Sequence, residues 1–244
     1  MIGNKKEPPE GVPDEEPSIP PDSDLALQPS DLLPGDVLLY RPRSPKVIQQ
    51  GISSATGSPY THAAIYIGGG LIAESGVPFG VTKSALKDSM QGNQCIAVLR
   101  SQLGFGGDRP RKLNEFVVAV LERKKFYNLI AVASFSKRSA EYFANHLEFV
   151  KKNYGEVISH EDFAEQSFFC SAFVVACYAV VGIIGETAQV AYQPNNFSPG
   201  RLGEDPTFGW LLGYLVPEGG AIPPDDPLLT EATLWRDCQD VRWW

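Results

Sequence analysis

The feature that most constrains this chain is a nearly uninterrupted apolar segment at residues 170–184. It contains no charged side chain, and a helical projection of it is apolar nearly all round. A helix of that kind is buried on every side. It is also shorter than the roughly 20 residues that a bilayer requires. We therefore predict a central helix around which the rest of the domain is built, and no transmembrane segment.

Short apolar runs bounded by glycine or proline predict strands. The first run covers residues 37–40, after a turn signal at residues 34–36. The second covers residues 62–67, and three glycines separate it from a third run at residues 71–74. That arrangement is typical of an antiparallel hairpin. Strands beside a buried helix predict an α+β fold. Further strand candidates are residues 96–99 and 116–121.

Composition divides the chain into a tail and one domain. Residues 1–29 are rich in proline, acidic residues and serine, and they contain few residues able to form a core. Such a stretch does not bury enough apolar surface to offset its ordering entropy, so we predict that it is disordered. Residues 30–244 then form the folded domain. Within it we expect an amphipathic helix at residues 139–154, ended by Gly155 and with this apolar face: Phe143, Leu147, Val150 and Tyr154.

The charge balance excludes some classes of partner. The 244 residues include 21 basic and 29 acidic side chains, which gives a formal net charge of −8. Nucleic acid and anionic lipid both require a basic face, so we expect neither as the main partner. The residues after Met1 contain no apolar targeting segment. We therefore expect the protein to be cytoplasmic as synthesised.

The four cysteines, Cys95, Cys170, Cys177 and Cys238, are too few and too scattered for a disulfide scaffold. None forms a CxxC pair of the kind that binds zinc. We therefore expect buried free thiols, one reactive thiol at most, and neither a metal nor an organic cofactor.

Two residues stand out as chemically active candidates. Cys170 opens the central helix, where the helix dipole and backbone amides lower a thiol pKa and where its own N–H can stabilise an oxyanion. His62 opens an apolar strand directly after a turn, whereas His146 lies in the amphipathic helix and His160 in a polar loop. A thiolate nucleophile requires a base, so Cys170 and His62 are predicted to act together. The alternative is that both are only core residues.

Glu74 is the candidate third residue. It lies at the end of the strand that the glycine hairpin brings against the strand of His62. Cross-strand neighbours can place a carboxylate against an imidazole nitrogen, which holds the tautomer and supports the imidazolium. This role depends on the pairing register. The alternative is a solvated charge at a strand end.

These residues resemble a known family, the circularly permuted NlpC/P60 group. That group includes the YiiX-like proteins and is related to the lecithin–retinol acyltransferase-like enzymes. In its papain-like core the histidine strand precedes the cysteine helix, and His62, Glu74 and Cys170 follow that order. The resemblance covers about residues 31–200 and rests on four short motifs: residues 33–40, 61–68, 72–74 and 169–174.

The resemblance implies a fold and a set of roles. The fold is a permuted papain-like core, in which an antiparallel sheet or small barrel packs on the helix that carries the cysteine. Cys170 is then the nucleophile, His62 the base and Glu74 the polar third residue. Tyr40 and Tyr60 are the candidates for an aromatic substrate-binding residue, and packing roles for them stay open. The insertion at about residues 100–165 matches nothing in the family.

The resemblance also implies two classes of substrate. The first is an amide bond in a peptide, above all a bacterial cell-wall stem peptide, and the residues after Cys170 favour it. The second is a lipid ester, attacked by the same triad in a phospholipase or acyltransferase reaction. Both pass through a thioester. If Cys170 and His62 are core residues, the chain is instead a peptide-binding or lipid-binding module.

A hydrolase without a cleaved signal fits an antibacterial effector, a toxin delivered by a contact-dependent secretion machine. It would then act in the periplasm of a target cell. Producer cells would require an inhibitor protein of the immunity type.

Overall fold

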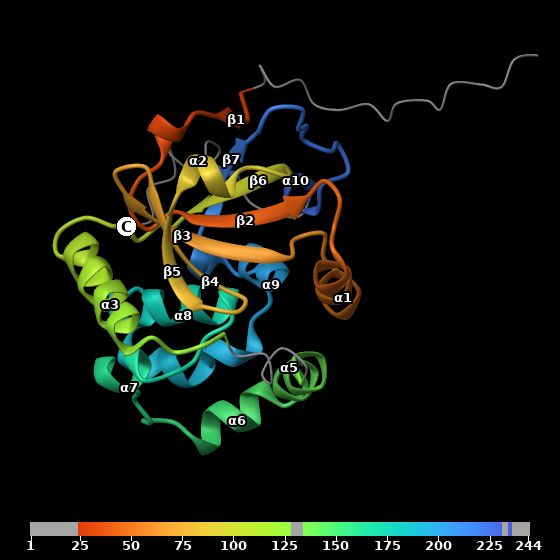
Figure 1. The fold of residues 1–244 in the computed structure, drawn as a ribbon. Coiled ribbons are helices and arrows are strands. Elements are labelled where there is room, and N and C mark those ends of the chain that lie inside the picture. The colour runs from red at the N-terminus through yellow and green to blue at the C-terminus, as the bar shows by residue number, and fades with distance from the viewer. Residues whose placement is uncertain (1–23, 128–133, 231–233, 236–244) are drawn as a thin grey trace, which may run out of the picture.

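The computed structural model describes residues 24–127, 134–230 and 234–235, and its main feature is a seven-stranded sheet (Figure 1). The strand order is β1-β7-β6-β2-β3-β4-β5. Neighbouring strands are antiparallel except for β1 and β7, which are parallel. The strands are β1 (Ala26–Leu27), β2 (Val37–Pro42), β3 (His62–Gly68), β4 (Leu71–Gly76), β5 (Gly80–Ala85), β6 (Asn93–Arg100) and β7 (Trp210–Leu215).

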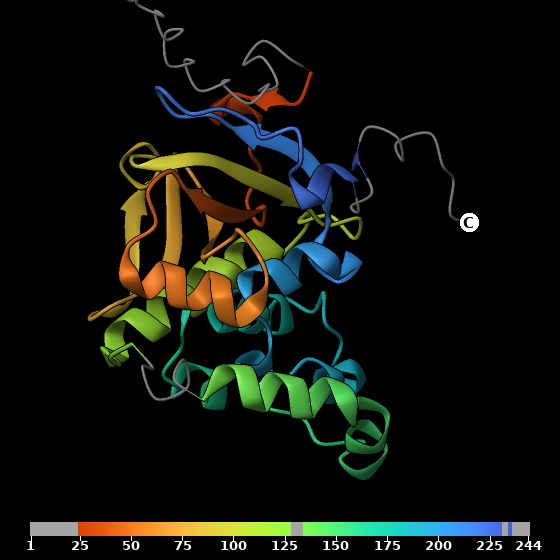
Figure 2. The same ribbon diagram turned by 90° about the vertical axis from the view of Figure 1, so that its right-hand side faces the viewer.

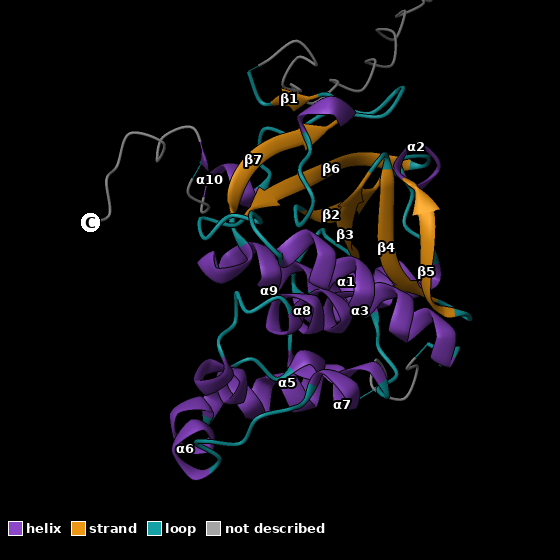
Figure 3. Ribbon diagram, turned by 90° about the vertical axis from the view of Figure 1, so that its left-hand side faces the viewer, coloured by secondary structure: helices purple, strands orange, loops and turns teal. Residues whose placement is uncertain are grey.

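Helices cover one face of this sheet in two layers (Figure 3). Helices α8 and α3 pack directly on strands β3, β4 and β5, while α5, α6 and α7 lie farther from the sheet. The molecule is therefore α+β, as predicted. The helices are α1 (Val47–Thr56), α2 (Leu86–Ser89), α3 (Arg109–Arg123), α5 (Phe135–Ala144), α6 (His146–Lys152), α7 (His160–Ala164), α8 (Cys170–Val180), α9 (Pro199–Glu204) and α10 (Pro227–Thr230).

Helix α8 is the central helix that the apolar segment predicted. Every one of its residues is buried, between the sheet on one side and α3, α9 and the 3-10 turn at Pro194–Asn196 on the others. Along the part of the chain that the structure describes, no helix combines the length and the apolarity needed to cross a membrane.

The predicted strands at residues 37–40, 62–67, 71–74 and 96–99 are confirmed within β2, β3, β4 and β6. Their apolar runs are continuous because both faces of the sheet are buried. Val37 and Leu39 belong to the cluster around α8, while Leu38 and Tyr40 pack into a second cluster on the opposite face.

The prediction of disorder is wrong for the last residues of the tail, 24–29. Residues 24–29 include strand β1, and a 3-10 helix follows at Pro29–Asp31. The backbone of Tyr214 donates to the Leu25 carbonyl at 2.7 Å. Gly213, with φ +154°, permits this approach, because a Cβ there would lie 2.5 Å from the Leu25 oxygen. Backbone pairing with β7 thus orders a segment whose composition favours disorder. Residues 1–23 lie outside the described residues.

Two further predictions, both for residues of the insertion, are wrong. Residues 116–121 lie in helix α3 instead of a strand, and its buried side chains have helical spacing: Leu113, Phe116, Val117 and Val120. The helix expected at residues 139–154 is divided into α5 and α6 at Asn145. Leu147 and Tyr154, expected on its apolar face, are exposed. Tyr142 is buried instead, with its hydroxyl donating to the Val190 carbonyl.

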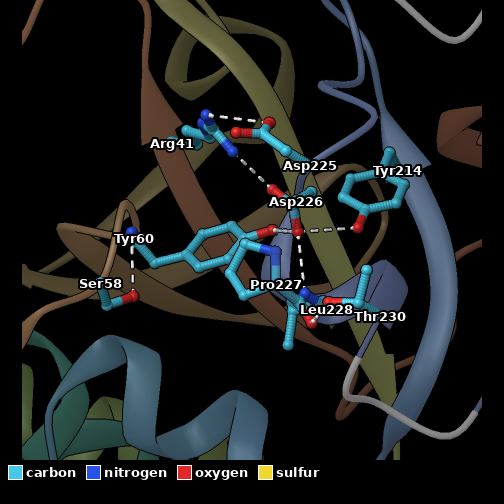
Figure 4. Close-up of polar contacts among 9 residues, drawn as sticks. All are labelled: Arg41, Ser58, Tyr60, Tyr214, Asp225, Asp226, Pro227, Leu228 and Thr230. Atoms are coloured by element: carbon cyan, nitrogen blue, oxygen red, sulfur yellow. Dashed lines mark hydrogen bonds and ion pairs between the residues drawn. The ribbon is translucent and has the colours of Figure 1, made fainter.

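A buried carboxylate ties the C-terminal part of the chain to the sheet (Figure 4). Asp226 is fully buried before α10. One of its oxygens accepts from Arg41 of β2 at 3.0 Å, and the other accepts from the hydroxyls of Tyr60 at 2.7 Å and Tyr214 at 3.0 Å. The Leu228 backbone N–H also donates to it at 3.1 Å. This buried charge is therefore fully paired, and it links β2, β7 and the segment before β3 to α10.

Replacement of Asp226 by alanine is expected to lower the free energy of unfolding by about 3 kcal/mol, because it leaves a partly buried Arg41 and two buried hydroxyls without their acceptor. Urea unfolding followed by circular dichroism measures the change. Asp225→Ala is the matched control. Asp225 is exposed and its contact with Arg41 is long, at 4.0 Å, so its replacement is expected to change the free energy of unfolding little. Equal effects of the two variants would contradict a structural role for the buried carboxylate.

Candidate active site

Cys170 is held at the first position of α8 by bonds from the segments beside it. Phe169 is extended and ends the preceding loop, so the helix begins at Cys170. The Ser75 hydroxyl of β4 donates to the Phe168 carbonyl at 2.8 Å, and the Ser171 hydroxyl donates to the Phe197 carbonyl at 2.7 Å. Both bonds are buried. They fix the start of the helix against the sheet and against the chain leading to α9.

His62 and Glu74 meet through the register of β3 and β4. Ala64 pairs with Glu74, so the side chains of His62 and Glu74 lie on one face as diagonal neighbours. Their Nε2 and Oε2 atoms are 2.6 Å apart. The other Glu74 oxygen accepts from the Ser84 hydroxyl of β5 at 2.7 Å. Three adjacent strands thus orient one carboxylate toward one imidazole.

The imidazole of His62 also lies close enough to the Cys170 thiol for each group to shift the pKa of the other. Burial by itself disfavours the imidazolium, but the bonds and charges of Cys170 and Glu74 outweigh it and raise the pKa of His62 to about 10. Burial likewise opposes the thiolate. The neighbouring His62 and the backbone N–H groups of Ala63 and Ser171 nevertheless lower the pKa of Cys170 below its ordinary 9.0. The two opposite pKa shifts therefore favour a thiolate–imidazolium pair over the neutral pair.

The carboxyl group of Glu74 completes this charge distribution. Burial raises its pKa, but the His62 imidazolium and the Ser84 hydroxyl together bring that pKa below its ordinary value of 4.5. Glu74 is therefore ionised at neutral pH, where its negative charge lies beside the His62 imidazole. The structure thus brings together the three residues selected from the sequence: Cys170, His62 and Glu74.

The two tyrosines named from the sequence lie in different surroundings. Tyr40 pairs with His62 across β2 and β3, and its ring centroid is 5.3 Å from the imidazole. Its hydroxyl lies 3.0 Å from the Ser89 hydroxyl, so Tyr40 forms part of the wall beside His62. Tyr60 is buried and its hydroxyl binds Asp226. Its contacts are those of a packing residue, and it does not line the hollows at Cys170 and His62.

Tyr127 is a site residue that the sequence analysis missed. Its hydroxyl lies close enough to the thiol and backbone of Cys170 for both to influence its pKa, and Tyr127 lines the cavity in front of the thiol. Burial, together with the nearby thiol charge, raises the pKa of Tyr127, so the phenol keeps its proton. Tyr127 lies in the insertion, where no motif marked it. The backbone N–H of Tyr127 donates to the Pro78 carbonyl at 3.3 Å, a contact that only the folded chain creates.

A cavity of about 280 Å³ opens in front of the Cys170 thiol. Helix α1 and the start of α5 form its walls, and its apolar lining includes Ile48, Ile52, Ala55, Tyr127, Phe135 and Phe169. His62 and Glu74 line a separate hollow of about 440 Å³ on the other side of α1. Cys170 and His62 thus line two different hollows, of which the one at Cys170 is the more apolar.

The other candidate groups do not gather at this site. His146 begins α6, where its ring packs against Tyr142 and its Nε2 lies 3.3 Å from the Ala191 carbonyl. His160 begins the short helix α7 instead of lying in a loop. Cys238 lies outside the described residues. Among the residues described, no three His, Cys, Asp or Glu side chains are arranged to hold a metal ion.

Comparison with known proteins gives little further information. No protein-family model matches the chain, and neither does any curated protein sequence. Among solved structures, the chain is similar to the crystal structure of the metalloprotein yiiX (DUF1105) from Escherichia coli O157:H7. The two share 16% identity over 82% of this chain and 94% of that chain, with a TM-score of 0.38. Identity and TM-score at these levels do not establish a shared core or a shared activity.

We expect iodoacetamide to alkylate Cys170 with a pH midpoint below 9.0, because the paired thiolate persists below the ordinary thiol pKa. In His62→Ala the midpoint is expected to rise above 9.0, since burial then acts without the imidazolium. Peptide mass spectrometry across a pH series measures both midpoints.

Cys95 and Cys177 are the internal controls for this measurement. Burial raises the pKa of Cys95 to about 12 and the pKa of Cys177 well above its ordinary value, so both are expected to remain unlabelled near neutral pH. A wild-type midpoint at or above 9.0, or equal slow labelling of all cysteines, would show that the pair does not form.

Proposed function

We propose that this protein is a cysteine hydrolase or acyltransferase in which Cys170 is the nucleophile, His62 the general base and acid, and Glu74 the residue that orients His62. One observation carries the proposal. The thiol at the start of a buried helix contacts an imidazole that is held by a carboxylate at 2.6 Å. That constellation is the one that nucleophilic acyl transfer requires.

The reaction follows from these positions. The Cys170 thiolate attacks the carbonyl carbon, and the resulting oxyanion is stabilised by the backbone N–H groups that open α8. The phenol of Tyr127, which lies at the same place, is a second donor. The C–N or C–O bond then breaks as the His62 imidazolium transfers its proton to the leaving group. A thioester on Cys170 remains.

His62 is neutral after this step and accepts a proton from water, or from another acceptor, as that molecule attacks the thioester. Cleavage of the C–S bond releases the acyl product and restores the thiolate beside the imidazolium. Glu74 stays ionised throughout and supports the imidazolium each time it forms.

A permuted papain-like core is the fold that we propose for this site. The four motifs noted in the sequence support it, as does the chain order in which the histidine strand precedes the cysteine helix. The arrangement of α8 against β3 and β4 is compatible with this proposal.

The scissile bond has two candidates. The motif after Cys170 favours the amide of a cell-wall stem peptide. A lipid ester is favoured by a different observation, the apolar lining of the cavity at the thiol. Both use the same three residues.

We further propose that the enzyme is an effector delivered to the periplasm of a target cell, with an inhibitor protein in the producer. Expression directed to the periplasm is expected to arrest growth, and Cys170→Ala is expected to abolish the effect. Harmless periplasmic expression of an enzyme that is active in vitro would refute this role.

Incubation of the purified protein with peptidoglycan fragments and, separately, with phospholipid vesicles is expected to yield products that depend on Cys170, read by mass spectrometry. Cys170→Ala removes the nucleophile and is expected to abolish turnover. Glu74→Gln is expected to lower kcat by about 10²–10⁴-fold, because an amide does not support the imidazolium.

Glu122→Gln is the matched control for Glu74→Gln. Glu122 is an exposed residue of α3, and its replacement is expected to leave kcat unchanged. Turnover that persists in Cys170→Ala would refute the proposed nucleophile, and an equal kcat for Glu74→Gln and Glu122→Gln would refute the proposed third residue.

A further inference from the structure

Tyr127 brings a phenol of the insertion to Cys170. Both residues line the same cavity, and the phenol lies close enough to the thiol and backbone of Cys170 to be influenced by both. A hydrogen-bond donor stabilises an oxyanion most when it is already held in place before the reaction, because no reorganisation is then needed. The contacts that hold Tyr127 in this position therefore bear directly on catalysis.

Residues 124–127 lie against the turn between β4 and β5, just after the end of α3 (Figures 1 and 2). The backbone N–H of Tyr127 donates to the Pro78 carbonyl at 3.3 Å. The Lys125 carbonyl approaches Gly80 so closely that a Cβ there would lie 2.0 Å from its oxygen. Gly80 also has a φ of +74°, which favours glycine. The turn thus accepts this segment because residue 80 has no side chain.

The other contacts at the end of α3 are weaker. Glu165 of the neighbouring loop lies 2.7 Å from Arg123 Nε and 3.4 Å from Lys125 Nζ, but its side chain is 58% exposed. Ion pairs in such surroundings contribute little. The backbone contacts with Pro78 and Gly80 are therefore the ones that fix the position of Tyr127.

We propose that Gly80 is a positioning residue for Tyr127. Its lack of a side chain seats residues 124–127 on the β4–β5 turn and holds the phenol where the oxyanion forms. A Cβ at residue 80 displaces the Lys125 carbonyl, and the phenol moves with it. The oxyanion then keeps the N–H groups at the start of α8 but loses its second donor. This inference rests on the proposed function and adds to it a contribution from the insertion.

Gly182 supplies a matched control for substitutions of Gly80. It has the same φ of +74°, but it is exposed just beyond the far end of α8, and a Cβ there meets nothing within 4 Å. Gly80→Ala and Gly182→Ala therefore impose the same kind of backbone strain, and only the first creates a clash. A difference between the two variants isolates the contact with Lys125.

The test measures Cys170-dependent hydrolysis of p-nitrophenyl acetate by the full-length protein. Tyr127→Phe removes the phenolic O–H and is expected to lower kcat by about 10²-fold, the scale of one oxyanion donor. Gly80→Ala is expected to lower kcat about tenfold or more with little change in KM, and Gly182→Ala to leave kcat within about twofold. In the Tyr127→Phe background, Gly80→Ala is expected to lower kcat by less than about twofold, because a residue that acts through the phenol has no effect without it.

Alkylation of Cys170 by iodoacetamide separates a displaced phenol from a damaged site, because alkylation forms no oxyanion. The thiolate is stabilised by His62 and by the backbone N–H groups of Ala63 and Ser171, none of which Gly80 holds. The pH midpoint of alkylation in Gly80→Ala is therefore expected to equal that of the wild type.

A second pair of variants covers the case in which circular dichroism shows that Gly80→Ala does not fold. Gly80→Asn carries the same Cβ, and asparagine adopts a positive φ more readily than alanine does. Gly182→Asn is its control. The same loss of kcat is expected for Gly80→Asn as for Gly80→Ala.

Four results would overturn the inference while leaving the nucleophile in place. They are an unchanged kcat in Tyr127→Phe, an equal kcat for the variants of Gly80 and Gly182, a loss from Gly80→Ala in the Tyr127→Phe background as large as in the wild type, and a shifted alkylation midpoint in Gly80→Ala. Hydrolysis that persists in Cys170→Ala, or a wild-type protein without hydrolysis, refutes the proposed function instead, and the inference fails with it.

Discussion

The antiparallel register of β3 and β4 is the constraint on which the site depends. Because side chains alternate along a strand, a slip of one residue would move Glu74 to the opposite face of the sheet and away from His62. The register is specified by the burial of both faces, since a slip would also exchange the residues of the two apolar clusters. Packing of the core and orientation of the imidazole are therefore consequences of one pairing.

The charges of the site depend on one another in the same way. Burial opposes every one of them, and each is retained because its neighbours stabilise it: the thiolate by His62 and two backbone N–H groups, the imidazolium by Cys170 and Glu74, and the carboxylate by His62 and Ser84. In a partly desolvated space such interactions are stronger than in water. Loss of one partner therefore alters the protonation of the others.

Helix α1 contributes to both hollows beside these charges. It has no buried residue, yet its side chains line both an apolar space at the thiol and a more polar space at the imidazole. The walls of the candidate site therefore come partly from a peripheral helix, while its three residues come from the sheet and the buried helix.

Local patterns in the sequence sufficed to predict the elements that carry the three candidate site residues. These elements are an apolar helix that opens with Cys170, a strand that opens with His62, and a glycine hairpin that returns the chain toward Glu74. The same local reasoning failed at residues 116–121, where a run of valines resembles a strand but has helical spacing. It also failed at residues 24–29, which pairing with a distant strand orders.

The tertiary structure alone decided the rest. It placed Tyr127 against the thiol, turned Tyr60 toward Asp226 and divided the two hollows at α1. Each of these depends on contacts between segments far apart in the chain, and such contacts are set by packing and burial, which periodicity and composition do not encode. The sequence by itself thus determined which residues are candidates for the site, and the fold determined what surrounds them.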